Sequence, residues 1–153
     1  APGIAQISFQ EEIIERENNL GLRDRAAIQV TQPTLSLFKA SHPNGRSILL
    51  IPGGGYARVV IDKEGFEGAR YYRRLGYDCY VLKYRLPHPD WPSRQNTPLE
   101  DAIRSMHYIR KKKGNDHIVS VMGFSAGGHF SGLFCDPFIN LPLLHISEPT
   151  RPY

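Results

Sequence analysis

Short, continuously apolar stretches recur along this chain. Residues 47–51, 79–83 and 118–122 each consist largely of β-branched, aliphatic or aromatic residues. Runs of this length are typical of strands that are buried on both faces of a sheet. Two further stretches with strand-like composition, residues 26–30 and 34–40, precede them. The pattern predicts five strands, with residues 47–51 at the centre of the sheet.

Two segments between these runs carry apolar residues at helical spacing. Residues 65–75 form the first, and Gly76 provides a fitting end. The second is expected to begin at Thr97 as N-cap, with proline at the first helical position and Glu100 three residues after the cap. Its apolar stripe leads to Gly114 and consists of Leu99, Ala102, Ile103, Met106 and Ile109. The alternation of strands and helices predicts an α/β fold with a parallel sheet and right-handed crossovers.

The last predicted strand ends in a motif that carries chemistry. The sequence Gly123-Phe124-Ser125-Ala126-Gly127 fits the pattern G-x-S-x-G of a nucleophile elbow. A serine at a sharp turn between strand and helix requires small residues two positions before and after it, so that the chains can pass closely. The helix that follows directs free amides at the hydroxyl, and the Ala126 amide is a natural donor to an oxyanion.

A second glycine-rich turn follows the strand at residues 47–51. Its sequence is Pro52-Gly53-Gly54-Gly55-Tyr56, and three glycines let backbone amides point into a cavity. The dinucleotide-binding pattern G-x-G-x-x-G fails, because Arg58 stands where the third glycine belongs. We interpret the turn as the second half of an oxyanion hole, similar to the HGGG turn of esterases but with proline in the histidine place.

Length and composition indicate one soluble, globular domain over residues 1–153. The chain has 41% hydrophobic and 22% charged residues, and residues 1–25 read as an irregular N-terminal arm with at most one short strand. No apolar run approaches the ~18 residues that a membrane span requires. No secretory apolar region is present, but the chain begins without methionine, so both a secreted or periplasmic and a cytoplasmic location are compatible with the sequence.

The formal net charge of +4 raises the question of an acidic partner. The only basic cluster is Arg110-Lys111-Lys112-Lys113, at the end of a predicted helix, where cations complement the helix dipole and face water. We therefore favour a solvated helix end over nucleic-acid binding. The two cysteines, Cys79 and Cys135, lack metal-site spacing and are either a disulfide or two buried thiols. No metal or other cofactor is expected.

Taken together, five blocks resemble α/β-hydrolases of the esterase/lipase superfamily, specifically the acetyl-xylan-esterase-type carbohydrate esterases. The resemblance covers about residues 34–132. Its blocks are Ile51-Pro52-Gly53-Gly54-Gly55-Tyr56, Asp62-Lys63-Glu64-Gly65, Leu82-Lys83-Tyr84-Arg85-Leu86-Pro87, Asp101-Ala102-Ile103-Arg104 and Gly123-Phe124-Ser125-Ala126-Gly127-Gly128-His129.

The resemblance implies an α/β-hydrolase fold, a three-layer sandwich around a parallel sheet. It also implies that Ser125 attacks an ester, such as an acetyl group on a carbohydrate, to form an acyl-enzyme. The amides of Gly53, Gly54 and Ala126 would hold the oxyanion, with Gly55 as a substitute. Three acidic residues in the matching blocks are interpreted as helix caps and loop anchors rather than as catalytic groups: Asp62, Glu64 and Asp101.

The chain departs from the family pattern after the elbow. An α/β-hydrolase needs an acid and then a histidine after the serine, each following a later strand, and only 28 residues follow Ser125. Asp136 is expected ~16 Å away, at the far end of the elbow helix. His145 is the remaining candidate for the base, although no predicted strand supports it, and His129 is expected to pack beside the elbow. We expect a hydrolase truncated after the elbow helix.

Three hypotheses follow from these observations. The first is a serine esterase that acts through Ser125 on a small ester or an acetylated carbohydrate. The second is a catalytically incomplete remnant or binding module, whose exposed last strand would favour self-association. The third is a peptidase of the acylpeptide type, or another hydrolase of the same fold, because the fold alone does not choose the substrate.

Overall fold

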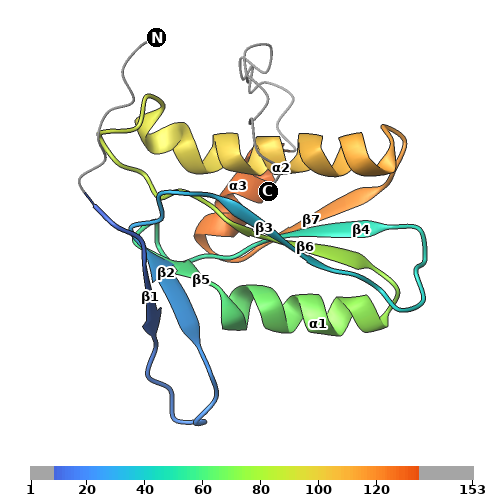
Figure 1. Ribbon diagram of the computed structural model, residues 1–153, viewed down its shortest axis with the longest axis horizontal. Coiled ribbons are helices and arrows are strands. Elements are labelled where there is room, and N and C mark those ends of the chain that lie inside the picture. The colour runs from blue at the N-terminus through green and yellow to red at the C-terminus, as the bar shows by residue number, and fades with distance from the viewer. Residues whose placement is uncertain (1–8, 135–153) are drawn as a thin grey trace.

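The computed structural model describes residues 9–134, which form two β-sheets with helices packed against them (Figure 1). The main sheet has the strand order β3-β6-β4-β7. Strands β4, β6 and β7 run parallel to one another, and β3 joins β6 in the antiparallel direction. Their bounds are β3 Thr34–Phe38, β4 Ser47–Ile51, β6 Asp78–Lys83 and β7 Val119–Gly123. The sequence prediction of a central strand at residues 47–51 is confirmed, since β4 lies between two neighbours and is buried throughout.

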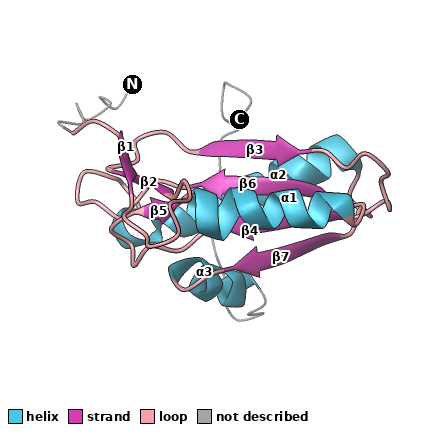
Figure 2. Ribbon diagram, turned by 90° about the horizontal axis from the view of Figure 1, so that it is seen from below, coloured by secondary structure: helices cyan, strands magenta, loops and turns pink. Residues whose placement is uncertain are grey.

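Helices cover both faces of the main sheet. Helix α1 (Glu67–Arg74) lies on one face, and helices α2 (Thr97–Lys113) and α3 (Ala126–Phe134) lie on the other (Figures 1 and 2). Alternate residues of β4 divide between the two layers: Leu49 and Ile51 pack in the core under α2 and α3, whereas Ile48 and Leu50 pack in the core under α1. A strand buried on both faces has few polar positions, which is why residues 48–51 read as a continuous apolar run after Ser47, whose buried hydroxyl is hydrogen-bonded to His117 Nε2.

A second, smaller sheet joins the N-terminal residues to the segment after β4. Strands β1 (Glu12–Glu15), β2 (Arg25–Ile28) and β5 (Val59–Val60) pair in the antiparallel direction in the order β1-β2-β5. The π-helical turn η1 (Asp62–Phe66) follows β5 and runs into α1. The stretch predicted as a strand at residues 26–30 thus belongs to a separate sheet, and the N-terminal arm contributes one strand to it.

The start of α2 differs from its prediction. A 3₁₀ turn, η2 (Arg94–Asn96), runs directly into α2, so that Asn96 occupies the N-cap and Thr97 is already helical, with φ of −53°. The Thr97 hydroxyl is buried and has no hydrogen-bond partner within residues 9–134. The Glu100 carboxylate accepts a hydrogen bond from Ser93 instead of closing a capping box. The helix ends at Gly114 as predicted.

Three residues singled out in the sequence lie outside the described residues: Cys135, Asp136 and His145. Within residues 9–134, Cys79 is a free, buried thiol, and burial raises its pKa to about 11. Across the same residues, none of the helices combines the length and the apolar character that a bilayer crossing requires.

Candidate active site

Ser125 occupies the turn between strand β7 and helix α3. It has φ of +51°, a left-handed conformation that residues other than glycine rarely adopt and that costs about 1–3 kcal/mol. The Phe124 amide donates to Ile51 O (3.1 Å) and the Gly127 amide donates to Phe124 O (2.8 Å), so the turn is held from both sides. Ser125 itself is exposed. Strained backbone thus presents the hydroxyl at the carboxyl end of the sheet, which is what a nucleophile elbow does.

The two glycines that flank the serine are required by contact. A Cβ added at Gly123 would lie 2.2 Å from Gly127 O, and one added at Gly127 would lie 2.0 Å from Ile51 O. Both distances are far below any ordinary contact, so the spacing G-x-S-x-G has the steric origin that the sequence predicts. The close approach brings the elbow against the end of β4, where the glycine-rich turn begins.

Gly53 lies directly against Ser125. A Cβ at Gly53 would lie 2.9 Å from Ser125 Cβ and 2.4 Å from Phe124 O. The Gly53 amide, however, donates to Glu64 Oε2 at 2.8 Å. This differs from the expectation that Gly53 holds an oxyanion, because a single N–H makes one strong hydrogen bond and this one is already engaged. Glu64 acts here as a loop anchor, as interpreted from the sequence.

Two other amides at the site are unengaged. Gly54 has φ of +141°, and its carbonyl accepts from the amides of Ala57 (3.2 Å) and Arg58 (3.3 Å). Among residues 9–134, neither the Gly54 amide nor the Ala126 amide has a hydrogen-bond partner. Ala126 is the first residue of α3, where helical amides have no partner within the helix and the dipole favours negative charge.

A tyrosine that the sequence analysis did not single out as a site residue connects the glycine-rich turn to the elbow helix. Tyr56 has φ of +62°, its hydroxyl is hydrogen-bonded to His129 Nδ1, and its ring stacks edge-on against Phe130 at 5.3 Å between centroids. Burial raises the pKa of the Tyr56 hydroxyl. The expectation that His129 packs beside the elbow is met, since the His129 amide also donates to Ser125 O at 3.1 Å. In the sequence, the position of Tyr56 directly after three glycines was the signal that could have identified it as a site residue.

The loop after β6 packs its aromatic side chains in the interior, and one of them supports the glycine-rich turn. Two aromatic residues of this loop, Tyr84 and Trp91, are buried. The Tyr84 hydroxyl donates to Pro52 O at 2.8 Å, and the Trp91 indole donates to Leu86 O at 3.0 Å. Burial also raises the pKa of Tyr84. Tyr84 therefore holds the beginning of the glycine-rich turn, and its ring packs edge-on against Phe130.

Two buried carboxylates anchor loops through arginine. Asp62 binds the Arg25 guanidinium at 2.8 and 2.9 Å and also accepts from the Arg25 amide at 2.8 Å. The hydrogen bond from Arg25 lowers the pKa of Asp62. Asp101, which is fully buried, binds Arg85 in the same manner, with a shortest distance of 2.6 Å to Nη2. Among residues 9–134 the hydrogen bonds to the carboxylates of Asp62 and Asp101 come from Arg25 and Arg85 and not from Ser125, in agreement with their interpretation as anchors.

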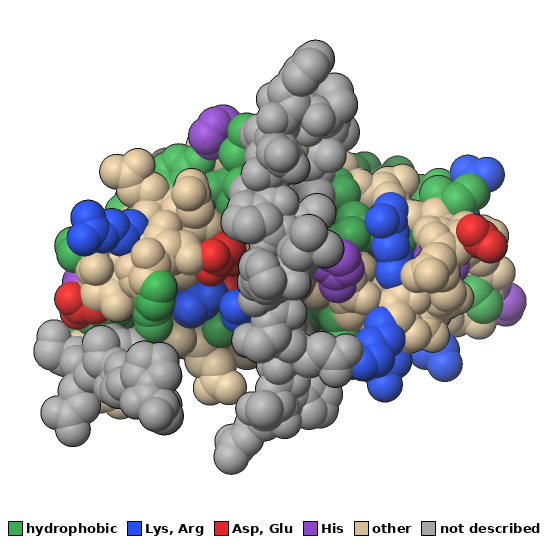
Figure 3. Space-filling model, turned by 90° about the horizontal axis from the view of Figure 1, so that it is seen from above, with side chains coloured by type: hydrophobic (Ala, Val, Ile, Leu, Met, Phe, Trp, Pro, Cys, Tyr) green, Lys and Arg blue, Asp and Glu red, His purple; other side chains and the backbone are tan. Residues whose placement is uncertain are grey.

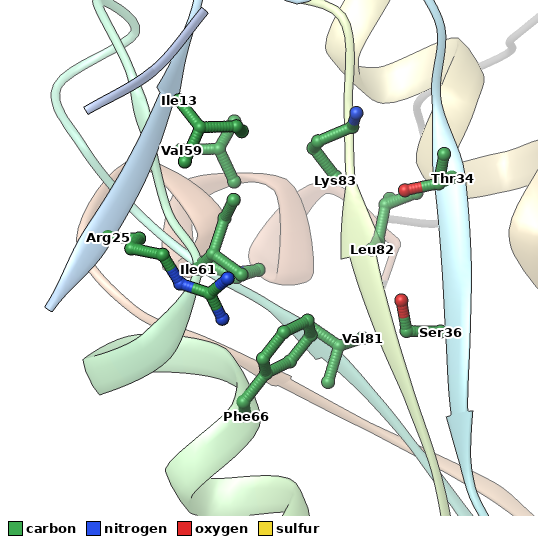
Figure 4. A pocket seen from close by; sticks show the side chains of 11 residues that line it. Ile13, Arg25, Thr34, Ser36, Val59, Ile61, Phe66, Val81, Leu82 and Lys83 are labelled. Atoms are coloured by element: carbon green, nitrogen blue, oxygen red, sulfur yellow. The ribbon is translucent and has the colours of Figure 1, made fainter. Parts of the chain in front are cut away.

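A cavity of about 200 Å³ lies between the two sheets, and Ser125 is not among the residues that line it. Strands β2 and β5 contribute Arg25 and Val59 to its wall, and β3 and β6 contribute Ser36 and Leu82 (Figure 4). Its second cation, Lys83, pairs with Glu11. Because both cations already have carboxylate partners, the cavity presents an essentially apolar interior with its charges neutralised.

Among residues 9–134, neither the potential metal ligands nor the basic side chains gather into a site (Figure 3). Residues 9–134 contain no group of three or more histidine, cysteine or acidic side chains able to hold a metal ion. Figure 3 shows lysine and arginine side chains spread over the visible face among hydrophobic and acidic ones. Residues 110–113 are exposed at the end of α2, and Lys113 pairs with Asp78 at 2.6 Å. Their interpretation as a solvated helix end fits this position.

No family model matches the chain, but individual proteins do. An acetylxylan esterase of Xylanibacter ruminicola is 34% identical over 100 residues, which are 63% of this chain and 20% of that protein. Esterase LipC of Mycobacterium tuberculosis is 30% identical over 88 residues, which are 56% of this chain and 22% of that protein. The chain spans about a fifth of the length of these curated relatives.

Solved structures share the fold. The α/β-hydrolase MGS-M1, from a deep-sea metagenome library of the Medee basin, superposes with a TM-score of 0.54 at 27% identity, over 78% of this chain and 49% of that one. A sugar hydrolase, YeeB of Lactococcus lactis, superposes with a TM-score of 0.52 at 19% identity, over 83% of this chain and 47% of that one. The chain thus spans about half of each solved structure. With its elbow between β7 and α3, the chain has an α/β-hydrolase fold and is similar to carbohydrate esterases and lipases that share it.

Proposed function

We propose that this protein is a serine esterase that removes acetyl groups from a carbohydrate, with Ser125 as the nucleophile. One observation carries the proposal: Ser125 is exposed on strained backbone against Gly53, and the amides of the adjacent residues Gly54 and Ala126 have no hydrogen-bond partner among residues 9–134. Strain of this kind concentrates at functional sites, and open amides beside a nucleophile are suited to an oxyanion. The name of the acetylxylan esterase relative supports acetylated carbohydrate as the substrate class.

In the proposed reaction, Ser125 Oγ attacks the acyl carbon and its proton passes to a base. The carbonyl oxygen becomes an oxyanion, for which Gly54 and Ala126 supply the amide donors in place of the Gly53 amide that Glu64 occupies. The sugar hydroxyl leaves with a proton, and water then releases acetate from the acyl-serine. Removing one donor of this kind typically costs about 3 kcal/mol of transition-state stabilisation.

His145 stays the candidate for the base, on chain order alone, because it lies outside the described residues. His129 is closer in sequence, but its Nδ1 is engaged by Tyr56. The proposed nucleophile and oxyanion donors therefore lie within residues 9–134, whereas the base is a separate proposal to be tested by substitution.

The test is hydrolysis of p-nitrophenyl acetate and of an acetylated xylo-oligosaccharide, compared with the Ser125→Ala and His145→Ala variants. Turnover that is abolished by Ser125→Ala and reduced at least about 100-fold by His145→Ala supports the full assignment. Turnover lost only in Ser125→Ala supports the nucleophile and removes His145 as the base. Equal rates in all three proteins contradict the esterase proposal for this chain.

The alternative is an incomplete hydrolase that acts as a binding module. Its supporting observation is strand β7, which lies at the edge of the main sheet within residues 9–134 and is only half-buried, whereas β4 is fully buried. Ile118, just before it, is 57% exposed. An open strand edge with apolar residues favours association. Concentration-dependent oligomers in size-exclusion chromatography, together with unreactive Ser125, would favour this alternative.

A further inference from the structure

The contact between Glu64 and Gly53 joins a carboxylate to the turn that faces the nucleophile. Glu64 lies in η1, and its Oε2 accepts the Gly53 amide at 2.8 Å. A Cβ built on Gly53 would lie 2.9 Å from this same oxygen and 2.9 Å from Ser125 Cβ. The carboxylate and the nucleophile therefore flank a single glycine.

Glu64 has no cation to neutralise it among residues 9–134. An unpaired negative charge opposes the negative charge that develops during ester hydrolysis nearby. Among residues 9–134 the Glu64 side chain makes one hydrogen bond, to the Gly53 amide, and this contact is the role that can offset the electrostatic disadvantage.

The geometry of consecutive peptide planes indicates that role. In a trans peptide, the carbonyl and the following amide point in opposite directions. Tyr84 holds the Pro52 carbonyl (2.8 Å) on one side and Glu64 holds the Gly53 amide on the other, so the plane between Pro52 and Gly53 is fixed at both ends. The Val60 amide donates to the Gly53 carbonyl at 2.9 Å. The next plane is thus held at its carbonyl, with the Gly54 amide at its open end.

We propose that Glu64 is a positioning residue: by holding the Gly53 amide, it orients the glycine-rich turn so that the Gly54 amide, rather than the Gly53 amide, is presented to the oxyanion beside Ser125. The inference rests on the proposed esterase function. It assigns the two oxyanion donors to Gly54 and Ala126, and it explains why a carboxylate is placed so near the nucleophile without contacting substrate.

The test uses Glu64→Ala, Glu64→Gln and a matched control, Glu67→Ala, which removes an exposed carboxylate three residues later. Glutamine keeps an oxygen that can accept the Gly53 amide, whereas alanine does not. The first readout is the residual dipolar coupling of the Gly54 N–H in an aligned sample, which reports the direction of that bond. The second is hydrogen exchange of the Gly53 amide, and the third is the rate at which a fluorophosphonate labels Ser125.

In Glu64→Ala we expect a changed Gly54 coupling, Gly53 exchange at least about tenfold faster, and labelling about 10- to 100-fold slower, because misplacing a reacting group by ~1 Å costs about 100-fold. Glu64→Gln and Glu67→Ala should keep the wild-type coupling and label within about threefold of wild type. If Glu64→Ala does not fold, Glu64→Asp replaces it, since its side chain is one methylene too short for the contact.

An unchanged Gly54 coupling in Glu64→Ala, or in Glu64→Asp where that replaces it, overturns the inference, as does an unchanged labelling rate despite faster Gly53 exchange. A wild-type protein that resists labelling counts against the esterase proposal, and the Gly54 coupling then decides the positioning role by itself. The two failures are therefore distinguishable.

Discussion

Replacing Gly127 by alanine tests the close approach on which the elbow depends. The added Cβ would lie 2.0 Å from Ile51 O and 2.8 Å from Pro52 O. Since Cβ atoms essentially never approach another heavy atom closer than 3.0 Å, helix α3 and the end of β4 must separate by about 1 Å. Ile51 O also accepts the Phe124 amide at 3.1 Å, so the same movement lengthens a hydrogen bond that holds the turn.

The cost can be estimated from these two effects. Overpacking a well-packed contact costs about 1–3 kcal/mol, and losing the hydrogen bond adds about 1 kcal/mol. We expect Gly127→Ala to lose about 3 kcal/mol of unfolding free energy, which corresponds to a fall in Tm of about 10 °C for a chain of this length. A displacement of ~1 Å at the nucleophile should slow fluorophosphonate labelling of Ser125 about 100-fold.

The same helix offers a matched control. A Cβ at Gly132 would meet nothing within 4 Å, so Gly132→Ala should gain about 0.5–1 kcal/mol from helix propensity and leave labelling unchanged. Thermal unfolding followed by circular dichroism and timed labelling would be measured on both variants. If Gly127→Ala were as stable and as reactive as Gly132→Ala, the steric account of the elbow would be refuted.

Three further predictions concern buried side chains outside the elbow. The pKa of Asp62 is lowered, chiefly by its hydrogen bond from Arg25, so the pair stabilises the fold fully above about pH 4 and less as pH falls through the lowered pKa. In urea unfolding, Asp62→Asn should therefore have a lower unfolding free energy than wild type at pH 7, and the difference should shrink at pH 2.5. A difference that does not change with pH would contradict this. Asp101→Ala should lower the unfolding free energy measured with urea by about 3–5 kcal/mol, because it removes the buried carboxylate that pairs with Arg85. A loss below about 1 kcal/mol would contradict a stabilising role of this pair. Cys79, with its pKa raised to about 11, should resist iodoacetamide at pH 8 until the protein unfolds, as mass spectrometry of the modified peptide can show.

The parts of the fold that follow simple periodicity could be predicted from the sequence. Strands β4 and β6 are recognised because burial on both faces leaves few polar positions, and α2 because its buried stripe repeats at helical spacing. The elbow could be predicted because steric exclusion at Gly123 and Gly127 acts between neighbours in sequence. These features depend on local or repeating patterns, which a single sequence displays.

Features that depend on contacts between distant residues could not be predicted in the same way. The direction of the Gly53 amide is set by Glu64 and by Tyr84, which lie 11 and 31 residues away in sequence, and no local pattern reveals it. Strand β5 has two residues, too few for any alternation, so the small sheet was not anticipated. Thr97 was predicted as a cap from composition, but the preceding 3₁₀ turn moves the cap to Asn96.

The turn η1 connects the hairpin formed by β1 and β2 to the residues around Ser125. Asp62, its first residue, accepts hydrogen bonds from Arg25 of strand β2. Glu64, two residues later, accepts a hydrogen bond from the Gly53 amide beside Ser125. A displacement of the hairpin would therefore be transmitted through η1 to the turn that carries the proposed oxyanion donor Gly54. Truncations or fusions near residues 12–28 are therefore expected to disturb the proposed site, although the hairpin lies outside the main sheet.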